Sequence, residues 1–126
     1  MKVNSNIKEN KVSLILNLKK NGINNPEILR VIEEIDRSYF VDSHLFDKSN
    51  LNTALPIDCG QTISQPLIVA LMTQHLEVKS NMRVLEVGTG SGYQTLVLSK
   101  MAKFVYTIER YKTLHQKAKE LLKIIK

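Results

Sequence analysis

The chain has 126 residues, enough for one small domain, and its 43% hydrophobic and 24% charged residues are typical of a soluble globular protein. Its longest apolar run, residues 67–72, is far too short to span a membrane, and its polar N-terminus does not resemble a secretory signal, so we expect no membrane association. The net charge is +6, but residues 1–99 contain ten basic and ten acidic side chains, so the whole excess lies in residues 100–126.

Residues 1 to about 50 are predicted to form a helical region. A first helix ends at Asn21-Gly22, a pair that favours a left-handed C-terminal stop. A second begins at Asn25-Pro26-Glu27, because asparagine can cap a helix, proline fits the first turn and glutamate suits the positive end of the helix dipole. We therefore divide the domain into an N-terminal helical region, 1–50, and a second region, 51–126.

Residues 51–66 show no helical period, and a loop of this length inside a compact domain is more often functional than idle. The loop contains the single cysteine, Cys59, so no intramolecular disulfide can form, and a cytoplasmic location is the simplest interpretation. By composition alone, the run GQTISQP at residues 60–66 is a polar turn before a helix at about 66–76, and Ser64 could cap that helix.

The rest of the chain alternates strands and helices. We predict a strand at residues 83–87, a helix at about 93–101, a strand at 104–108 and a final helix. This order predicts an α/β fold with a parallel, doubly wound sheet of the Rossmann type. We interpret the basic side chains of the last segment as a solvated helix face, since no nucleic-acid-binding motif accompanies them, and we do not expect a nucleic-acid partner.

A glycine loop, Gly88-Thr89-Gly90-Ser91-Gly92, joins the first strand to its helix. Glycines at such a turn let the backbone approach a ligand, and the free N–H groups of the helix attract an anion. The pattern differs from the dinucleotide fingerprint GxGxxG, whose third glycine would fall at Tyr93. Glu86 precedes the loop, and it either caps local backbone groups or accepts from the amino group of a ligand.

A second acid, Glu109, directly follows the second strand. Its carboxylate is placed to accept hydrogen bonds from ribose hydroxyls, as the acid of a dinucleotide site does. The alternative is a surface acid paired with Arg110 or Lys112. Together, the strand, loop, helix, strand and acid favour a ligand site.

The glycine loop with its preceding acid resembles the first motif of class I methyltransferases, whose ligand is S-adenosylmethionine. The run GQTISQP, followed about twenty residues later by VLEVGTGSGYQT, narrows this resemblance to protein-L-isoaspartate O-methyltransferases. ALP at residues 54–56, YFV at 39–41 and IER at 108–110 extend it over essentially the whole chain. The resemblance implies that S-adenosylmethionine is bound by Glu86, Gly88, Thr89, Gly90, Ser91, Gly92 and Glu109.

The resemblance also implies the activity. Such enzymes transfer a methyl group to the α-carboxylate of L-isoaspartyl residues in damaged proteins, so isoaspartyl-containing peptides and proteins are the expected partners. Thr62, Ile63 and Ser64 would line the substrate site, and Ser64, the expected catalytic residue, would hydrogen-bond the carboxylate. A carboxylate is already a nucleophile and needs no general base, and the three scattered histidines do not have metal-ligand spacing.

The family's sheet has seven strands, and this chain supplies two. The resemblance therefore implies the N-terminal part of a truncated class I methyltransferase fold, and we expect the 126 residues alone to be a marginal fold and a poor catalyst. Two alternatives stay open: another class I methyltransferase, or a non-catalytic binding module that keeps the nucleotide loop. The sequence does not indicate an oligomeric state.

Overall fold

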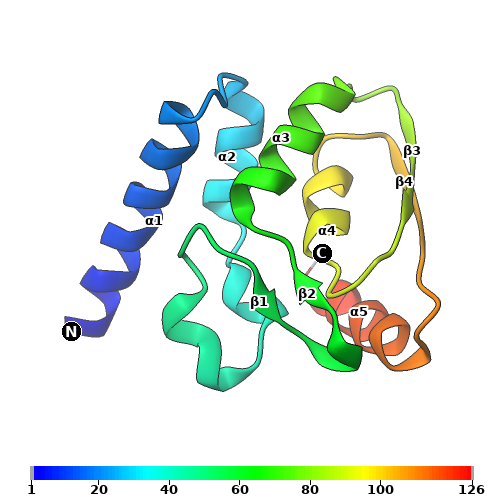
Figure 1. The fold of residues 1–126 in the computed structure, drawn as a ribbon. Helices are drawn as coiled ribbons and strands as arrows, with labels where there is room; N and C mark the ends of the chain where they lie inside the picture. The colour runs from blue at the N-terminus through cyan, green and yellow to red at the C-terminus, as the bar shows by residue number, and fades with distance from the viewer. Residues whose placement is uncertain (1, 126) are drawn as a thin grey trace.

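The structure is a computed structural model that describes residues 2–125 and, from residue 10 onward, their side chains (Figure 1). The first half contains helices α1 (Lys2–Lys20) and α2 (Pro26–Glu34) and the short 3-10 helices η1 (Arg37–Phe40) and η2 (Ser43–Lys48). The middle contains β1 (Leu55–Pro56), η3 (Asp58–Gly60), β2 (Thr62–Ile63) and α3 (Pro66–Leu76). The last part contains β3 (Arg83–Val87), α4 (Tyr93–Ser99), β4 (Phe104–Ile108) and α5 (Lys112–Ile125).

Local chemistry sets the boundary between the first two helices as predicted. Gly22, two residues after the end of α1, has a φ of +96°, a left-handed conformation that glycine adopts without strain. The side-chain oxygen of Asn25 accepts hydrogen bonds from the backbone N–H groups of Glu27 and Ile28, and Pro26 is the first helical residue. These caps turn the chain so that α1 and α2 pack together.

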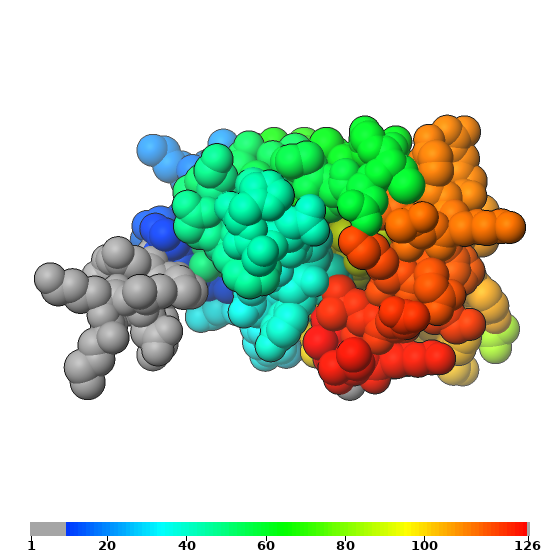
Figure 2. All heavy atoms as spheres, turned by 90° about the horizontal axis from the view of Figure 1, so that it is seen from below, coloured from blue at the N-terminus to red at the C-terminus, as the bar shows by residue number. Residues whose placement is uncertain are grey.

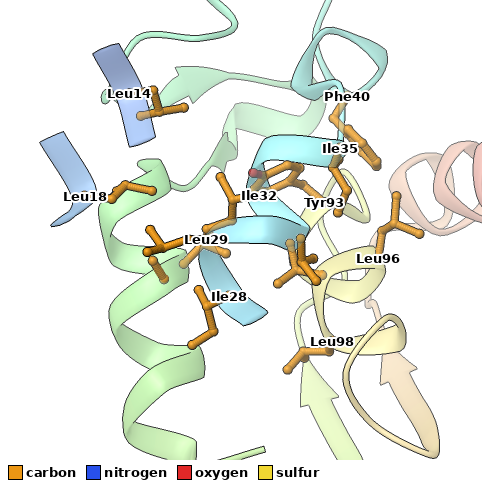
Figure 3. Close-up of a cluster of buried hydrophobic side chains, with 14 of the residues drawn as sticks. Leu14, Leu18, Ile28, Leu29, Ile32, Ile35, Phe40, Tyr93, Leu96 and Leu98 are labelled. Carbon is orange, nitrogen blue, oxygen red and sulfur yellow. The ribbon is translucent and has the colours of Figure 1, made fainter. Parts of the chain in front are cut away.

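Helix α2 lies at the centre of the hydrophobic core (Figure 3). Its side chains Ile28 and Ile32 are almost fully buried, and the helix contacts α1, α3 and α4. Leu14 and Leu18 of α1 enter the same cluster from one side, and Leu96 and Leu98 of α4 enter it from the other. The two predicted regions therefore share one core.

Strands β3 and β4 form a parallel sheet with Arg83 opposite Phe104 and Val87 opposite Ile108. Both strands have the predicted bounds, and α4 connects them, so the α/β prediction with a parallel sheet is confirmed. In Figure 1, α3, α4 and α5 all lie on one side of this sheet. The described residues thus supply one helical layer of the predicted doubly wound arrangement.

The opposite face of the β3–β4 sheet is open. Its large apolar side chains are between 50% and 76% exposed: Leu85, Val87, Phe104, Tyr106 and Ile108. Parallel sheets normally have both faces covered, so a row of exposed apolar residues on one face is unusual. No described helix combines the length and hydropathy that crossing a membrane requires.

Residues 49–64, here called the hairpin segment, contain more structure than the predicted loop. Strands β1 and β2 pair antiparallel, with Leu55 opposite Ile63 and Pro56 opposite Thr62. The hairpin turns tightly at η3, where Cys59 has a φ of 61° although it is not a glycine. Two strands of two residues each are too short to produce a recognisable alternation in the sequence.

Candidate functional site

The glycine loop between β3 and α4 is shaped by three glycines with positive φ: +92° at Gly88, +55° at Gly90 and +93° at Gly92. A Cβ atom at Gly92 would lie 3.4 Å from side-chain atoms of Ala118 and Leu122, so this glycine lets the loop pack closely on α5. A Cβ atom at Gly88 would meet no heavy atom within 4 Å. The loop is therefore packed on one side and open at Gly88, where a ligand can approach the backbone.

A network of side chains braces the glycine loop from inside. Oε1 of Glu86 accepts hydrogen bonds from the hydroxyls of Thr95, at 2.5 Å, and Thr107, at 2.7 Å. The Thr89 and Thr107 hydroxyl oxygens are 2.6 Å apart, and Thr89 is the donor because Thr107 has already donated its single proton to Glu86. Burial raises the pKa of Glu86, and the two hydroxyl hydrogen bonds oppose that rise. The side chains of Glu86 and Thr89 thus point into the fold.

Glu109 joins the glycine loop to the start of α5. One carboxylate oxygen accepts from the Gly90 amide at 3.0 Å and the other from the Tyr111 amide at 2.9 Å. The Tyr111 hydrogen bond is the main cause that holds the pKa of Glu109 below its ordinary value, and the Gly90 amide adds to it. The charged carboxylate keeps further lone pairs with which it can accept hydrogen bonds from hydroxyl groups.

The alternative interpretation of Glu109, an ion pair with Arg110 or Lys112, is not what the structure shows. Neither basic group lies within salt-bridge distance of the Glu109 carboxylate. Arg110 instead donates to the Tyr111 hydroxyl at 2.5 Å, and its guanidinium carbon lies 4.6 Å from the centroid of that ring. The Glu109 carboxylate is therefore held by backbone amides.

An open cleft of about 400 Å³ brings the two predicted motifs together. Its lining comes from the hairpin segment, the glycine loop and the end of β4: Gln61, Val87, Gly88, Ile108, Glu109, Arg110 and Tyr111. Figure 2 shows the green hairpin segment beside the orange segment that follows β4. The cleft offers a carboxylate and exposed backbone, which suit hydroxyl groups of a ligand. It also offers the apolar ends of two strands, which suit an apolar part of the same ligand.

The three predicted substrate residues differ in exposure. Thr62 and Ser64 are exposed, whereas the side chain of Ile63 is only 3% exposed and belongs to the hydrophobic core. Gln61, which the sequence did not single out, lines the cleft, whereas Thr62, Ile63 and Ser64 follow it along the chain and are not among the lining residues. The Ile63 side chain is buried and anchors β2 in the core, so only the backbone of Ile63 is left to face a ligand.

Ser64 does not cap α3. The N-cap position is Gln65, which makes no side-chain capping hydrogen bond. The Leu67 amide in the first turn instead donates to Oδ1 of Asn52 at 3.0 Å, so an asparagine 15 residues earlier serves as the cap. The Ser64 hydroxyl is therefore not used in capping the helix.

Two residues missed by the sequence analysis, Thr95 and Thr107, complete the network around Glu86. The sequence could have indicated one of them. Aligning the two predicted five-residue strands side by side in parallel, from their first residues, places Thr107 opposite Glu86. Among the described residues, no three His, Cys, Asp or Glu side chains gather closely enough to hold a metal ion.

The chain matches the family model described as protein-L-isoaspartate(D-aspartate) O-methyltransferase over residues 9–125. A protein-L-isoaspartate O-methyltransferase from Rhodospirillum rubrum is 50% identical over 112 residues, which are 89% of this chain and 51% of the relative. One from Caulobacter vibrioides is 50% identical over 117 residues, which are 93% of this chain and 53% of the relative. The chain thus spans about half the length of these relatives.

Solved structures agree with this match. A protein-L-isoaspartate O-methyltransferase superimposes with a TM-score of 0.80 and 27% identity, over 91% of this chain and 38% of that protein. A Plasmodium falciparum protein assigned as the same kind of enzyme superimposes with a TM-score of 0.78 and 30% identity, over 92% and 56%. That structure is a complex with S-adenosyl-L-homocysteine. The class I methyltransferase fold is confirmed for the part that this chain covers.

Proposed function

The chain belongs to the protein-L-isoaspartate(D-aspartate) O-methyltransferase family, and from this premise we propose that it provides the cofactor loop and the acceptor-facing segment of an enzyme that methylates L-isoaspartyl residues in damaged proteins. The observation that carries the proposal is the cleft in which Gln61, Gly88 and Glu109 meet. A cytoplasmic location belongs to the proposal, supported by the single, unpaired cysteine.

The residues of the cleft fit S-adenosylmethionine, which supplies an electrophilic methyl group when bound. The Glu109 carboxylate, kept charged by two amides, would accept hydrogen bonds from the ribose hydroxyls. The open backbone at Gly88 leaves room for the ligand to lie against the loop. The side chains of Glu86 and Thr89 would act indirectly, by holding the loop in shape from inside.

The exposed hydroxyls of Thr62 and Ser64 would bind the acceptor. Ser64, the proposed catalytic residue, would donate a hydrogen bond to the α-carboxylate of the isoaspartyl residue and orient it. A carboxylate is a nucleophile without losing a proton, so orientation is the main contribution that these residues have to make. The buried Ile63 between them keeps the two hydroxyls on a segment anchored in the core.

Two measurements test the proposal. Calorimetric titration of the 126-residue chain with S-adenosylhomocysteine tests the cofactor cleft. Methyl labelling of an L-isoaspartyl peptide tests the acceptor, with this chain and with a chimera in which the remainder of the Rhodospirillum rubrum relative follows it. We expect the chimera to label the isoaspartyl peptide and not the same peptide with normal aspartate, and Ser64→Ala to slow labelling about tenfold or more. Equal labelling of both peptides would refute the assignment.

A further inference from the structure

Arg37 of η1 is a buried cation without a carboxylate partner. It is only 1% exposed, and neither ion pair of the described residues includes it. Burial lowers the pKa of its guanidinium, but an arginine side chain stays protonated in proteins. The cost of burying this charge must therefore be offset by hydrogen bonds.

Four backbone carbonyl oxygens of the hairpin segment surround the Arg37 guanidinium. Nη1 donates to the carbonyls of Ser49, at 3.1 Å, and Leu51, at 3.3 Å. Nη2 donates to those of Thr53, at 2.7 Å, and Ser64, at 3.1 Å. Three acceptors lie at the start of the segment and one at its end, so a single planar group holds the two ends together.

The hairpin between those ends has little regular structure of its own, since its two strands have two residues each. Its tip nevertheless lies against the glycine loop and α5. Ile57 Cδ1 is 3.8 Å from the Cβ position of Gly90, and Asp58 forms a 2.5 Å ion pair with Lys117. Because that ion pair is exposed, it contributes little by itself. Leu55 and Ile63 anchor the two strands in the core, so the direction of the hairpin depends on these side chains and on how its base is held.

We propose that Arg37 is a positioning residue for acceptor binding: its guanidinium clamps the base of the hairpin segment and so holds Ser64, and Gln61 at the cofactor cleft, in place. The inference rests on the proposed function for the identity of the acceptor. Arg37 itself makes no contact with the cleft, and it acts through the carbonyl of Ser64 and through the three carbonyls at the start of the segment.

The experiment compares Arg37→Met and Arg37→Lys with the wild-type chain. Arg30→Met is the matched control, because Arg30 is an exposed arginine of the same helical region that pairs only with Glu34. Hydrogen–deuterium exchange is measured for residues 49–64 and, as an internal reference, for 83–92. Calorimetry gives the affinity for S-adenosylhomocysteine and, with that ligand present, for an L-isoaspartyl peptide.

In Arg37→Met we expect exchange in residues 49–64 to accelerate about tenfold or more, with little change in 83–92. Peptide affinity should fall about tenfold, and S-adenosylhomocysteine affinity should change far less. Arg37→Lys should restore part of both properties, because an ammonium can keep some of the carbonyl bonds but not the planar fork. Arg30→Met should match the wild type.

The proposal is overturned if hydrogen exchange in residues 49–64 does not change. It is also overturned if exchange accelerates equally in residues 49–64 and 83–92 of both Arg37 variants, or if the affinities for S-adenosylhomocysteine and for the peptide fall by the same factor. Should Arg37→Met not fold, the same comparison is decided by Arg37→Lys. A wild-type chain that binds no isoaspartyl peptide would count against the proposed function, whereas the exchange result would still decide whether Arg37 clamps the segment.

Discussion

Replacing Glu109 by alanine should weaken binding of S-adenosylhomocysteine without unfolding the chain. The carboxylate uses one lone pair of each oxygen to accept from the amides of Gly90 and Tyr111, and under the proposed function the remaining lone pairs would accept hydrogen bonds from the ribose hydroxyls. The side chain is only partly buried, so after its removal water can solvate both amides. The loss should therefore appear in affinity rather than in stability.

The size of the effect follows from the number of hydroxyl bonds lost. A hydrogen bond to a charged group contributes about 1.5–3 kcal/mol, so losing one weakens binding by about 10- to 150-fold. Because the cleft is open to water, we expect the low end of this range, about tenfold or somewhat more. Glu109→Gln should lie between alanine and wild type, since glutamine keeps one acceptor oxygen but turns an N–H group toward one of the two amides.

The assay is calorimetric titration with S-adenosylhomocysteine, with Glu120→Ala as the control. Glu120 is an exposed acid of α5 whose carboxylate accepts from Gln116 at 2.8 Å, and it lies outside the cleft. Because the pKa of Glu109 is lowered, wild-type affinity should not change through this group between about pH 8 and 5, and should weaken only at lower pH. Unchanged affinity in a folded Glu109→Ala variant would remove this carboxylate from the site.

Three further predictions concern stability. The raised pKa of Glu86 means that its burial costs stability as the pH rises from about 4.5 through the folded pKa, so Glu86→Gln should remove that loss in thermal unfolding measured as a function of pH. Leu85→Lys, on the open sheet face, should change the free energy of unfolding by no more than about 0.5 kcal/mol and should reduce light scattering from self-association. Leu98→Ala, in the core, should lower the free energy of unfolding measured by urea denaturation by about 2–5 kcal/mol. Cys59→Asn should raise the melting temperature slightly because asparagine tolerates a left-handed φ, and Cys59→Val should lower it.

The regular elements were predictable where the sequence has a strong local signal. Both strands of the parallel sheet and α3 have the predicted bounds, because short apolar runs and a proline in the first turn mark them clearly. Helix α4 ends at Ser99 rather than at the predicted Met101. There the Lys100 amide lies within reach of the carbonyls of Leu96, Val97 and Leu98, and such shared bonds close the last turn of a helix early.

The site was predictable only in part, because its parts are joined by contacts between distant segments. The motifs identified the glycine loop and Glu109, but not the clamp at Arg37, whose partners lie 12 to 27 residues away. Those partners are backbone carbonyls, which every residue type carries, so no pattern of side chains could indicate them. Likewise, the two-residue strands that place Gln61 at the cleft are too short to show a period.

The structure also shows that neighbouring residues of the loop motif point in opposite directions. Strand alternation sends Val87 toward the open face and Glu86 toward the helices, where its carboxylate accepts from Thr95 and Thr107. The acid that precedes the glycine loop therefore stabilises the loop's shape, and under the proposed function Glu109, which follows the next strand, would meet the ligand. Substitutions of Glu86 should consequently lower the affinity for the cofactor indirectly, by destabilising the glycine loop. Substitutions of Glu109 should lower it directly, by removing a contact with the cofactor.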